Sequence, residues 1–236
     1  MIPIRDDAPR STTPWVNYFL ISVNSLVFLL EVALDPRARS AVIYQFGMVP
    51  ASITALVLGV RHSSAEAALV PVITSMFLHA SWLHVIGNMW ALYIFGDNVE
   101  DHLGHARYLL LYFLCGIAAS LVHAVFNLNS AVPSVGASGA IAGVMGAYFL
   151  LFPAARVLTL VPFFFVYFIW LPAWLVLGYW FVVQFLGGAS TAITYSQESG
   201  GGGVAFWAHV GGFVAGVLMI KLLPARPKRY QYYGWQ

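Results

Sequence analysis

The chain is a succession of long apolar runs separated by short polar segments. Six of these runs approach the roughly 20 residues that a helix needs to cross the hydrocarbon core of a bilayer. They are Trp15–Leu34, Ser81–Gly96, Tyr108–Phe126, Val135–Phe152, Trp170–Leu186 and Val204–Leu223. The pattern therefore predicts an all-α polytopic membrane protein. Its six-helix domain covers 15–223, between a cytoplasmic N-terminal segment at 1–14 and a cytoplasmic tail at 224–236.

One apolar stretch, Val157–Leu186, is too long for one upright helix and short for two helices with a turn. Pro162 and Pro172 interrupt it. Because proline breaks a membrane helix at such positions, we interpret Val157–Ile169 as an interfacial or re-entrant piece that is followed by a single span.

The positive charges predict the orientation. With the N-terminus in the cytoplasm, the inside set is Arg5, Arg10, Arg107, Arg156, Lys221, Arg226, Lys228 and Arg229, and the outside set is Arg37, Arg39 and Arg61. This excess agrees with the positive-inside rule, so both termini are expected in the cytoplasm. The absence of further soluble domains and of a transit peptide favours a bacterial or archaeal plasma membrane.

The composition supports a membrane protein and excludes other classes. Only 8% of the residues are charged and 60% are hydrophobic, whereas a soluble domain has about a quarter of its residues charged. The lipid bilayer is therefore its main surrounding partner. A net charge of +2 is too small to suggest nucleic acid, and the single cysteine excludes an intrachain disulfide framework.

Polar side chains inside spans are costly, and they mark function or a buried partner. The second span carries His84 and Asn88 in its first two turns, with His79 just before it. The fourth span opens with Ser138, and the sixth has His209 in its second turn. At about 1.5 Å per residue, all of these groups lie roughly 5 to 12 Å below the same membrane face.

This set of residues suits nucleophilic catalysis. A serine needs a nearby base to take its proton, and the neutral imidazole of His209 tolerates a membrane interior better than a carboxylate does. No Asp or Glu lies in Val204–Leu223, so we predict a Ser138–His209 dyad. His84 and Asn88 share a helix face and can donate to an oxyanion, as can the backbone N–H of Ser138 at a helix start.

A simpler explanation exists for each residue alone. Small residues such as those of GASGA, with Gly143 and Gly146, are typical of close helix packing, and Gly212 and Gly216 repeat the pattern. A lone His or Asn in a span more often makes a hydrogen bond to another helix than takes part in catalysis. The coincidence of one depth, one face and complementary roles favours catalysis.

FLHASWLHVIGNM, EDHLG, GASGA and AHVGGFVAG occur in this order between about Val70 and Leu223. In this order and spacing they resemble the rhomboid intramembrane serine proteases. The resemblance implies that the Ser138–His209 dyad lies in a water-filled cavity opening away from the cytoplasm. It implies oxyanion stabilisation by His84, Asn88 and the Ser138 amide, with His79 as a further candidate. It also implies cleavage of transmembrane protein substrates without metal, ATP or another cofactor.

Structural roles are assigned to Glu100, Gly104, Gly136, Gly139, Gly212 and Gly216, with Glu100 tying its loop to Gly104. Two features found in members of the rhomboid family are missing from this sequence. Some rhomboids carry an aromatic residue four positions after the serine, where this chain has Ala142, so another aromatic must orient the histidine. No clear Trp-Arg pair occurs between Asp35 and Ser75. The segment Gly187–Gly203 is expected to be a flexible loop on the outer side, either a lid over the cavity or a plain linker.

Other functions fit less well. A zinc protease would need His-Glu-x-x-His, and no histidine is followed by glutamate, so no metal site is predicted. An aspartyl protease would need two intramembrane aspartates, and Asp97 is the single candidate. A channel would place polar residues at several depths. The alternative that stays open is a non-catalytic rhomboid-like factor that binds membrane proteins, which the loss of Ser138 or His209 would indicate.

Overall fold

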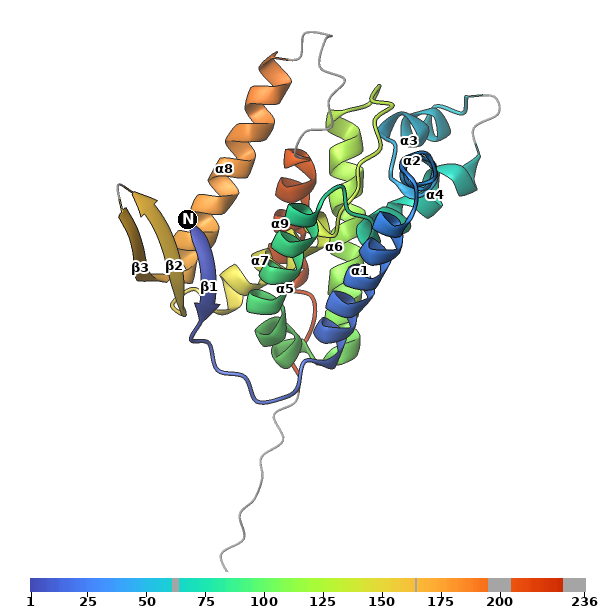
Figure 1. Ribbon diagram of the computed structural model, residues 1–236. Coiled ribbons are helices and arrows are strands. Elements are labelled where there is room, and N and C mark those ends of the chain that lie inside the picture. The colour runs from blue at the N-terminus through green and yellow to red at the C-terminus, as the bar shows by residue number, and fades with distance from the viewer. Residues whose placement is uncertain (61–63, 164, 195–204, 227–236) are drawn as a thin grey trace, which may run out of the picture.

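Helices dominate the computed structural model, which describes residues 1–60, 64–163, 165–194 and 205–226 (Figure 1). The helices are α1 (Trp15–Ala33), α2 (Pro36–Phe46), α3 (Pro50–Val57), α4 (Ala65–Thr74), η1 (Ser75–Phe77), α5 (Trp82–Leu103), α6 (His105–Phe126), α7 (Ser138–Leu151), α8 (Ala173–Thr194) and α9 (Phe206–Met219). Each of the six predicted runs overlaps one of the helices α1, α5, α6, α7, α8 and α9, and α5, α6 and α8 extend beyond their runs.

Not all of these helices are long enough to cross a membrane. Within the described residues, α1, α6 and most of α8 meet the length and composition of a span, and α4–η1 with α5 form a fourth if that pair, bent by 77°, counts as one. Helices α7 and α9 have 14 residues each, or about 21 Å, less than the roughly 30 Å of the hydrocarbon core. The predicted count of six spans is therefore not confirmed.

The prediction of an all-α chain is wrong, because three strands form an antiparallel sheet in the order β1-β2-β3. They are β1 (Ile2–Asp6), β2 (Arg156–Phe163) and β3 (Phe165–Pro172). The stretch Val157–Ile169, predicted as an interfacial or re-entrant piece, is a β-hairpin, which its β-branched and aromatic residues favour. One helix, α8, follows it, as predicted.

The N-terminal strand attaches the sheet to the helices. Trp90 of α5 donates a hydrogen bond from its indole nitrogen to the Pro3 carbonyl oxygen at 2.8 Å, and the Tyr148 hydroxyl of α7 donates to the Asp6 carboxylate. The segment 1–14, set apart from the membrane domain in the sequence analysis, thus packs against α5 and α7.

The segment between α1 and α5 contains the short helices α2, α3 and α4, and Arg39 of α2 ties it to the start of α5. Its guanidinium donates to the carbonyl oxygens of His79 at 3.2 Å and Ala80 at 3.0 Å. The same group lies 5.8 Å from the ring centre of Phe28. Arg39 therefore braces this segment in a chain that lacks a clear Trp-Arg pair.

Helix α7 lies at the centre of the bundle and contacts α9 through glycines. A Cβ atom on Gly216 would overlap the carbonyl oxygen of Gly143, and one on Gly212 would overlap that of Gly139. Only glycine allows two backbones to approach so closely. The glycines for which we predicted close helix packing therefore lie at the contact between α7 and α9. Ser138 is the first residue of α7.

Helix α8 is packed more loosely. Its buried residues include Ala173, Val176 and Leu177, whereas Tyr179 and Val182 on the other face are exposed. The first part of the predicted loop Gly187–Gly203 is helical, because α8 continues to Thr194. The remaining positions of that predicted loop, 195–203, lie outside the described residues.

Candidate active site

Ser138 and His209 are in direct contact. Ser138 is the first residue of α7, and His209 lies in the first turns of α9. The Nε2 atom of His209 is 2.8 Å from the Ser138 Oγ atom, which is the distance of a good hydrogen bond. The glycine contacts between α7 and α9 hold these two side chains at this separation. A serine hydroxyl and an imidazole in this geometry have the arrangement that nucleophilic catalysis requires.

The other side of His209 faces α8. The Nδ1 atom of His209 is 2.7 Å from the Oε1 atom of Gln184, and the ring centres of Trp180 and His209 are 5.6 Å apart at 37°. Trp180 supplies the aromatic neighbour that Ala142 cannot provide. We predicted no role for Gln184 from the sequence. A side-chain amide within the apolar run Ala173–Leu186 nevertheless indicates a function or a buried partner.

His84 lies beside the serine. A Cβ atom placed on Gly136 would be 2.7 Å from the Cε1 and Nε2 atoms of His84 and 3.6 Å from the Ser138 Oγ atom. Gly136 also has φ of +131°, a conformation that other residues rarely adopt. The glycine is therefore required twice, for the turn before α7 and for the space that the His84 ring occupies.

Asn88, one turn further along α5, carries an unused donor. Its side chain is buried, and its Nδ2 atom has no hydrogen-bond partner within the part of the chain that is described. Buried polar groups are nearly always paired, so an amide left without a partner is free to bind a ligand.

His79 takes a different position from the one that its candidate role suggested. It is fully buried, its ring meets the ring of His84 edge-on at 5.1 Å, and its backbone N–H donates to the Glu31 carboxylate at 3.2 Å. Neither ring nitrogen has a hydrogen-bond partner in the described residues. The structure thus places His79 against His84 and does not join it to Ser138 or His209.

Glu100 lies at the far end of α5. Its buried carboxylate accepts hydrogen bonds from the backbone N–H groups of Val16 at 3.0 Å and Asn17 at 2.7 Å, and so caps α1. We predicted that Glu100 ties its loop to Gly104. Its main-chain oxygen does accept the Gly104 N–H at 2.7 Å, and Gly104 makes the turn into α6 with φ of +80°. The carboxylate binds α1 and also contacts the Nδ1 atom of His105, the residue after Gly104, at 2.5 Å.

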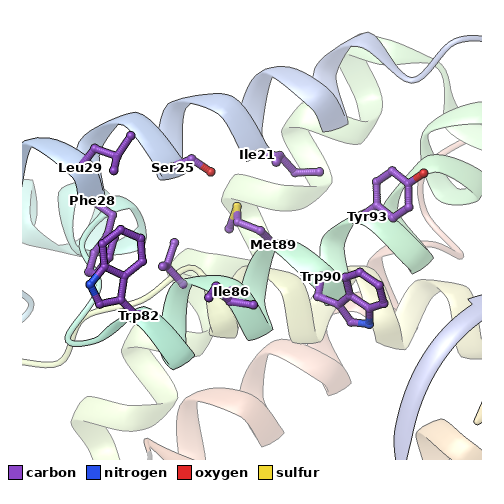
Figure 2. A pocket seen from close by; sticks show the side chains of 10 residues that line it. Ile21, Ser25, Phe28, Leu29, Trp82, Ile86, Met89, Trp90 and Tyr93 are labelled. Atoms are coloured by element: carbon purple, nitrogen blue, oxygen red, sulfur yellow. The ribbon is translucent and has the colours of Figure 1, made fainter. Parts of the chain in front are cut away.

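Two hollows differ in size and chemistry. A small cavity of about 20 Å³ beside Ser138 is lined in part by the hydroxyl-bearing Ser75 and Ser120, and it has room for roughly one water molecule. An apolar groove of about 500 Å³ lies between α1 and α5, where Phe28, Trp82 and Met89 line it (Figure 2). Ser138 lines the smaller cavity, whereas neither Ser138 nor His209 lines the groove.

Comparisons with known proteins point to one family. A family model described as Rhomboid domain matches residues 66–226. RHOMBOID-like protein 6, mitochondrial, of Arabidopsis thaliana is 44% identical over 75 residues, which are 32% of this chain and 24% of that protein. Rhomboid protein 1, mitochondrial, of Saccharomyces cerevisiae is 32% identical over 160 residues, 63% of this chain and 40% of that protein. Rhomboid protease GluP of Bacillus subtilis is 31% identical over 134 residues, 57% of this chain and 24% of that protein.

The chain thus spans less than half the length of these curated relatives. The matched region contains α5 to α9 and with them both members of the serine–histidine pair. The match covers more than half of the chain, and the protein therefore belongs to the rhomboid family.

Proposed function

We propose that this protein is an intramembrane serine endopeptidase that cleaves transmembrane segments of other membrane proteins. Ser138 is the nucleophile and His209 is the base. The observation that carries the proposal is the 2.8 Å contact between the Ser138 Oγ and His209 Nε2 atoms. Membership of the rhomboid family supports it, as does the name of the Bacillus subtilis relative, a rhomboid protease.

The first step forms an acyl-enzyme. The Nε2 atom of His209 takes the Ser138 hydroxyl proton as Oγ bonds to the carbonyl carbon of the scissile peptide, whose oxygen becomes an oxyanion. The donors proposed for this oxyanion are the Ser138 backbone N–H at the start of α7, where no intrahelical acceptor exists, the His84 ring and the unpartnered Asn88 amide. His209 then gives its proton to the leaving amine as the C–N bond breaks.

The second step consumes one water. Water attacks the ester carbonyl carbon and gives a proton to His209, the bond from the carbonyl carbon to Ser138 Oγ breaks, and Oγ regains the proton. The new carboxyl terminus leaves. The small polar cavity beside Ser138 has room for this water. Each group in the cycle belongs to the protein, the peptide or water, so no cofactor enters the proposal.

The placement of basic residues supports a site that opens away from the cytoplasm. The last turn of α5 and the first turn of α6 lie at one end of the bundle (Figure 1), whereas Ser138 follows the other end of α6. At the first of these ends, Arg107 donates to the Pro224 carbonyl oxygen and the Arg226 N–H donates to that of His102. By the positive-inside rule we propose that this end faces the cytoplasm, in agreement with the prediction of cytoplasmic termini. A bacterial or archaeal plasma membrane stays a prediction, and the mitochondrial names of two relatives extend the family to other membranes.

The decisive experiment uses liposomes that contain the purified protein and a single-pass membrane substrate. Ser138→Ala and His209→Ala should each abolish cleavage and leave the thermal unfolding midpoint near that of the wild type. Ser22→Ala is the matched control, because Ser22 is an exposed serine of α1, and it should cleave normally. Persistent cleavage by Ser138→Ala would refute the assignment. Binding of membrane proteins without any cleavage by the wild type would favour the non-catalytic alternative.

A further inference from the structure

Helix α8 reaches the base of the proposed dyad with two residues, four positions apart. Trp180 lies against the His209 ring, and the Gln184 side-chain oxygen is 2.7 Å from His209 Nδ1. Residues at this spacing share one helix face, so α8 contacts the side and the edge of one imidazole at the same time.

The chemistry of the base sets a requirement at Nδ1. His209 can take the serine proton at Nε2 only if Nε2 is unprotonated, so the neutral ring must carry its hydrogen on Nδ1. The Gln184 Oε1 atom can only accept a hydrogen bond. A glutamine oxygen facing Nδ1 therefore stabilises the tautomer in which Nε2 points its lone pair at Ser138. It continues to accept from Nδ1–H after His209 has become positively charged.

No carboxylate takes this role in the described part of the chain. The titratable side chains whose charge acts on His209 are His84 on α5 and His123 on α6, and neither can be an anion. In serine proteases with a triad, a buried aspartate holds the base in the correct tautomer. Here the neutral amide on α8 occupies the corresponding position.

We propose that Gln184 is a positioning residue that holds His209 in the tautomer competent to accept the Ser138 proton, and that the packing of α8 against α9 thereby controls the competence of the dyad. The inference rests on the proposed function. It differs from the ordinary role of a polar residue in a membrane helix, which is to join two helices by a hydrogen bond. A joining role would affect stability, whereas a positioning role changes the turnover rate and its dependence on pH.

The test compares Gln184→Leu, Gln184→Glu and the control Val182→Ala, whose side chain is 52% exposed on the other face of α8. Gln184→Leu removes the acceptor and keeps the size. Because a carboxylate partner in a triad is worth about 10⁴-fold, and an amide is uncharged, we expect kcat to fall about 10²-fold with KM and the thermal midpoint little changed. Val182→Ala should match the wild type in all three.

Gln184→Glu restores an acceptor and adds a negative charge. It should recover most of the activity at high pH, and the acid limb of the pH–rate profile should move to higher pH, because a carboxylate favours the protonated imidazole. A second readout needs no substrate. The imidazole ¹⁵N shifts of His209 should show hydrogen on Nδ1 in the wild type and a mixture of tautomers in Gln184→Leu.

Two results would overturn the inference. One is a wild-type kcat and wild-type ¹⁵N shifts in Gln184→Leu. The other is a pH–rate profile of Gln184→Glu that superimposes on that of the wild type. Failure of the proposed function looks different, since the wild type itself would then not cleave. If Gln184→Leu does not fold, the nearly isosteric Gln184→Glu still decides through its pH profile.

Discussion

The two sides of His209 are held by different kinds of packing. On one side, α9 meets α7 backbone to backbone, with Gly212 against Gly139 and Gly216 against Gly143. On the other side, α8 meets α9 through side chains such as Trp180, Phe181 and Phe213, while its opposite face is exposed. The first contact cannot adjust without moving a helix, whereas the second can change by rotation of a few side chains.

This difference separates two parts of the proposed mechanism. The distance from serine to histidine follows from the backbone contact, so it is set when the bundle folds. The orientation of the histidine ring depends on the hydrogen bond that Gln184 of α8 makes to His209 of α9. Hydrogen bonds between membrane helices stabilise the fold by only about 0.6 kcal/mol on average. A site built in this way can lose its orientation at little cost to stability.

The largest expected effect comes from the rigid side. Gly216→Val places a branched side chain where the Gly143 carbonyl oxygen lies, so α7 and α9 must separate. Overpacking of this kind costs about 1–3 kcal/mol when side chains can yield, and here only backbone is available to move. We expect loss of the folded protein or, where it folds, complete loss of cleavage, measured by thermal unfolding and by substrate turnover in liposomes.

Gly87→Val is the matched control for this substitution. Gly87 lies on α5, and a Cβ atom there would meet nothing within 4 Å, so the variant should fold and cleave as the wild type does. A fully active Gly216→Val protein would contradict the rigid contact.

An intermediate effect is expected from substitutions on α8, where side chains make the contact with His209. Trp180→Ala removes the ring that flanks His209 at 5.6 Å. It should lower kcat by about 10-fold, less than the loss of the hydrogen-bond acceptor, because the remaining bond still selects the tautomer. Combined with Gln184→Leu, its cost should be smaller than on its own, since both residues act through one ring.

Trp174→Ala controls for the loss of an indole from α8, because Trp174 is 53% exposed on the same helix. It should retain the wild-type kcat. Equal losses from the two tryptophan substitutions would show that α8 depends on its aromatic residues in general and not on contact with His209.

The smallest effect is expected at the end of α7 that is distant from Ser138. There Asp6 of β1 accepts a hydrogen bond from Tyr148. Burial raises the pKa of the Asp6 carboxyl above its usual value of 3.8, although the hydrogen bond from Tyr148 acts in the opposite direction. A raised pKa in the folded state means that protonated Asp6 stabilises the fold at low pH, and that this contribution is lost as pH rises through the raised value.

Asp6→Asn should remove this dependence. The thermal midpoint of the wild type, measured relative to that of Asp6→Asn, should fall by roughly 1–3 °C as the pH is raised from about 4 to about 8. The neighbouring Asp7, whose pKa is lowered by hydrogen bonds from Arg156, is present in both proteins, and its negative charge acts in the same direction as burial on the pKa of Asp6. A relative midpoint that rises over this interval would reverse the sign assigned to Asp6.

The differences between the predicted and the observed fold share one origin. The count of six spans equated apolar runs with spans, yet α7 and α9 are shorter than their runs. The stretch after Arg156, which we interpreted as interfacial or re-entrant, forms a hairpin that pairs with β1. Strand pairing between residues about 150 positions apart, and the point where a helix ends, depend on neighbours that no local pattern specifies. The Gln184 amide marks a buried partner or a function in its apolar run, and only the fold shows that this partner is His209.

The sequence by itself determined that the protein is embedded in a membrane and that helices form in six apolar runs. It also determined that a serine, two histidines and an asparagine lie near the same end of those helices. These features follow from hydrophobic length and helical rise, which are local properties. The tertiary structure alone decided that α7 and α9 touch at their glycines and that α8 brings Gln184 to His209. It also decided that the Asn88 donor has no partner among the described residues. Each of these depends on the relative position of helices distant in sequence, which arises only when their side chains pack together.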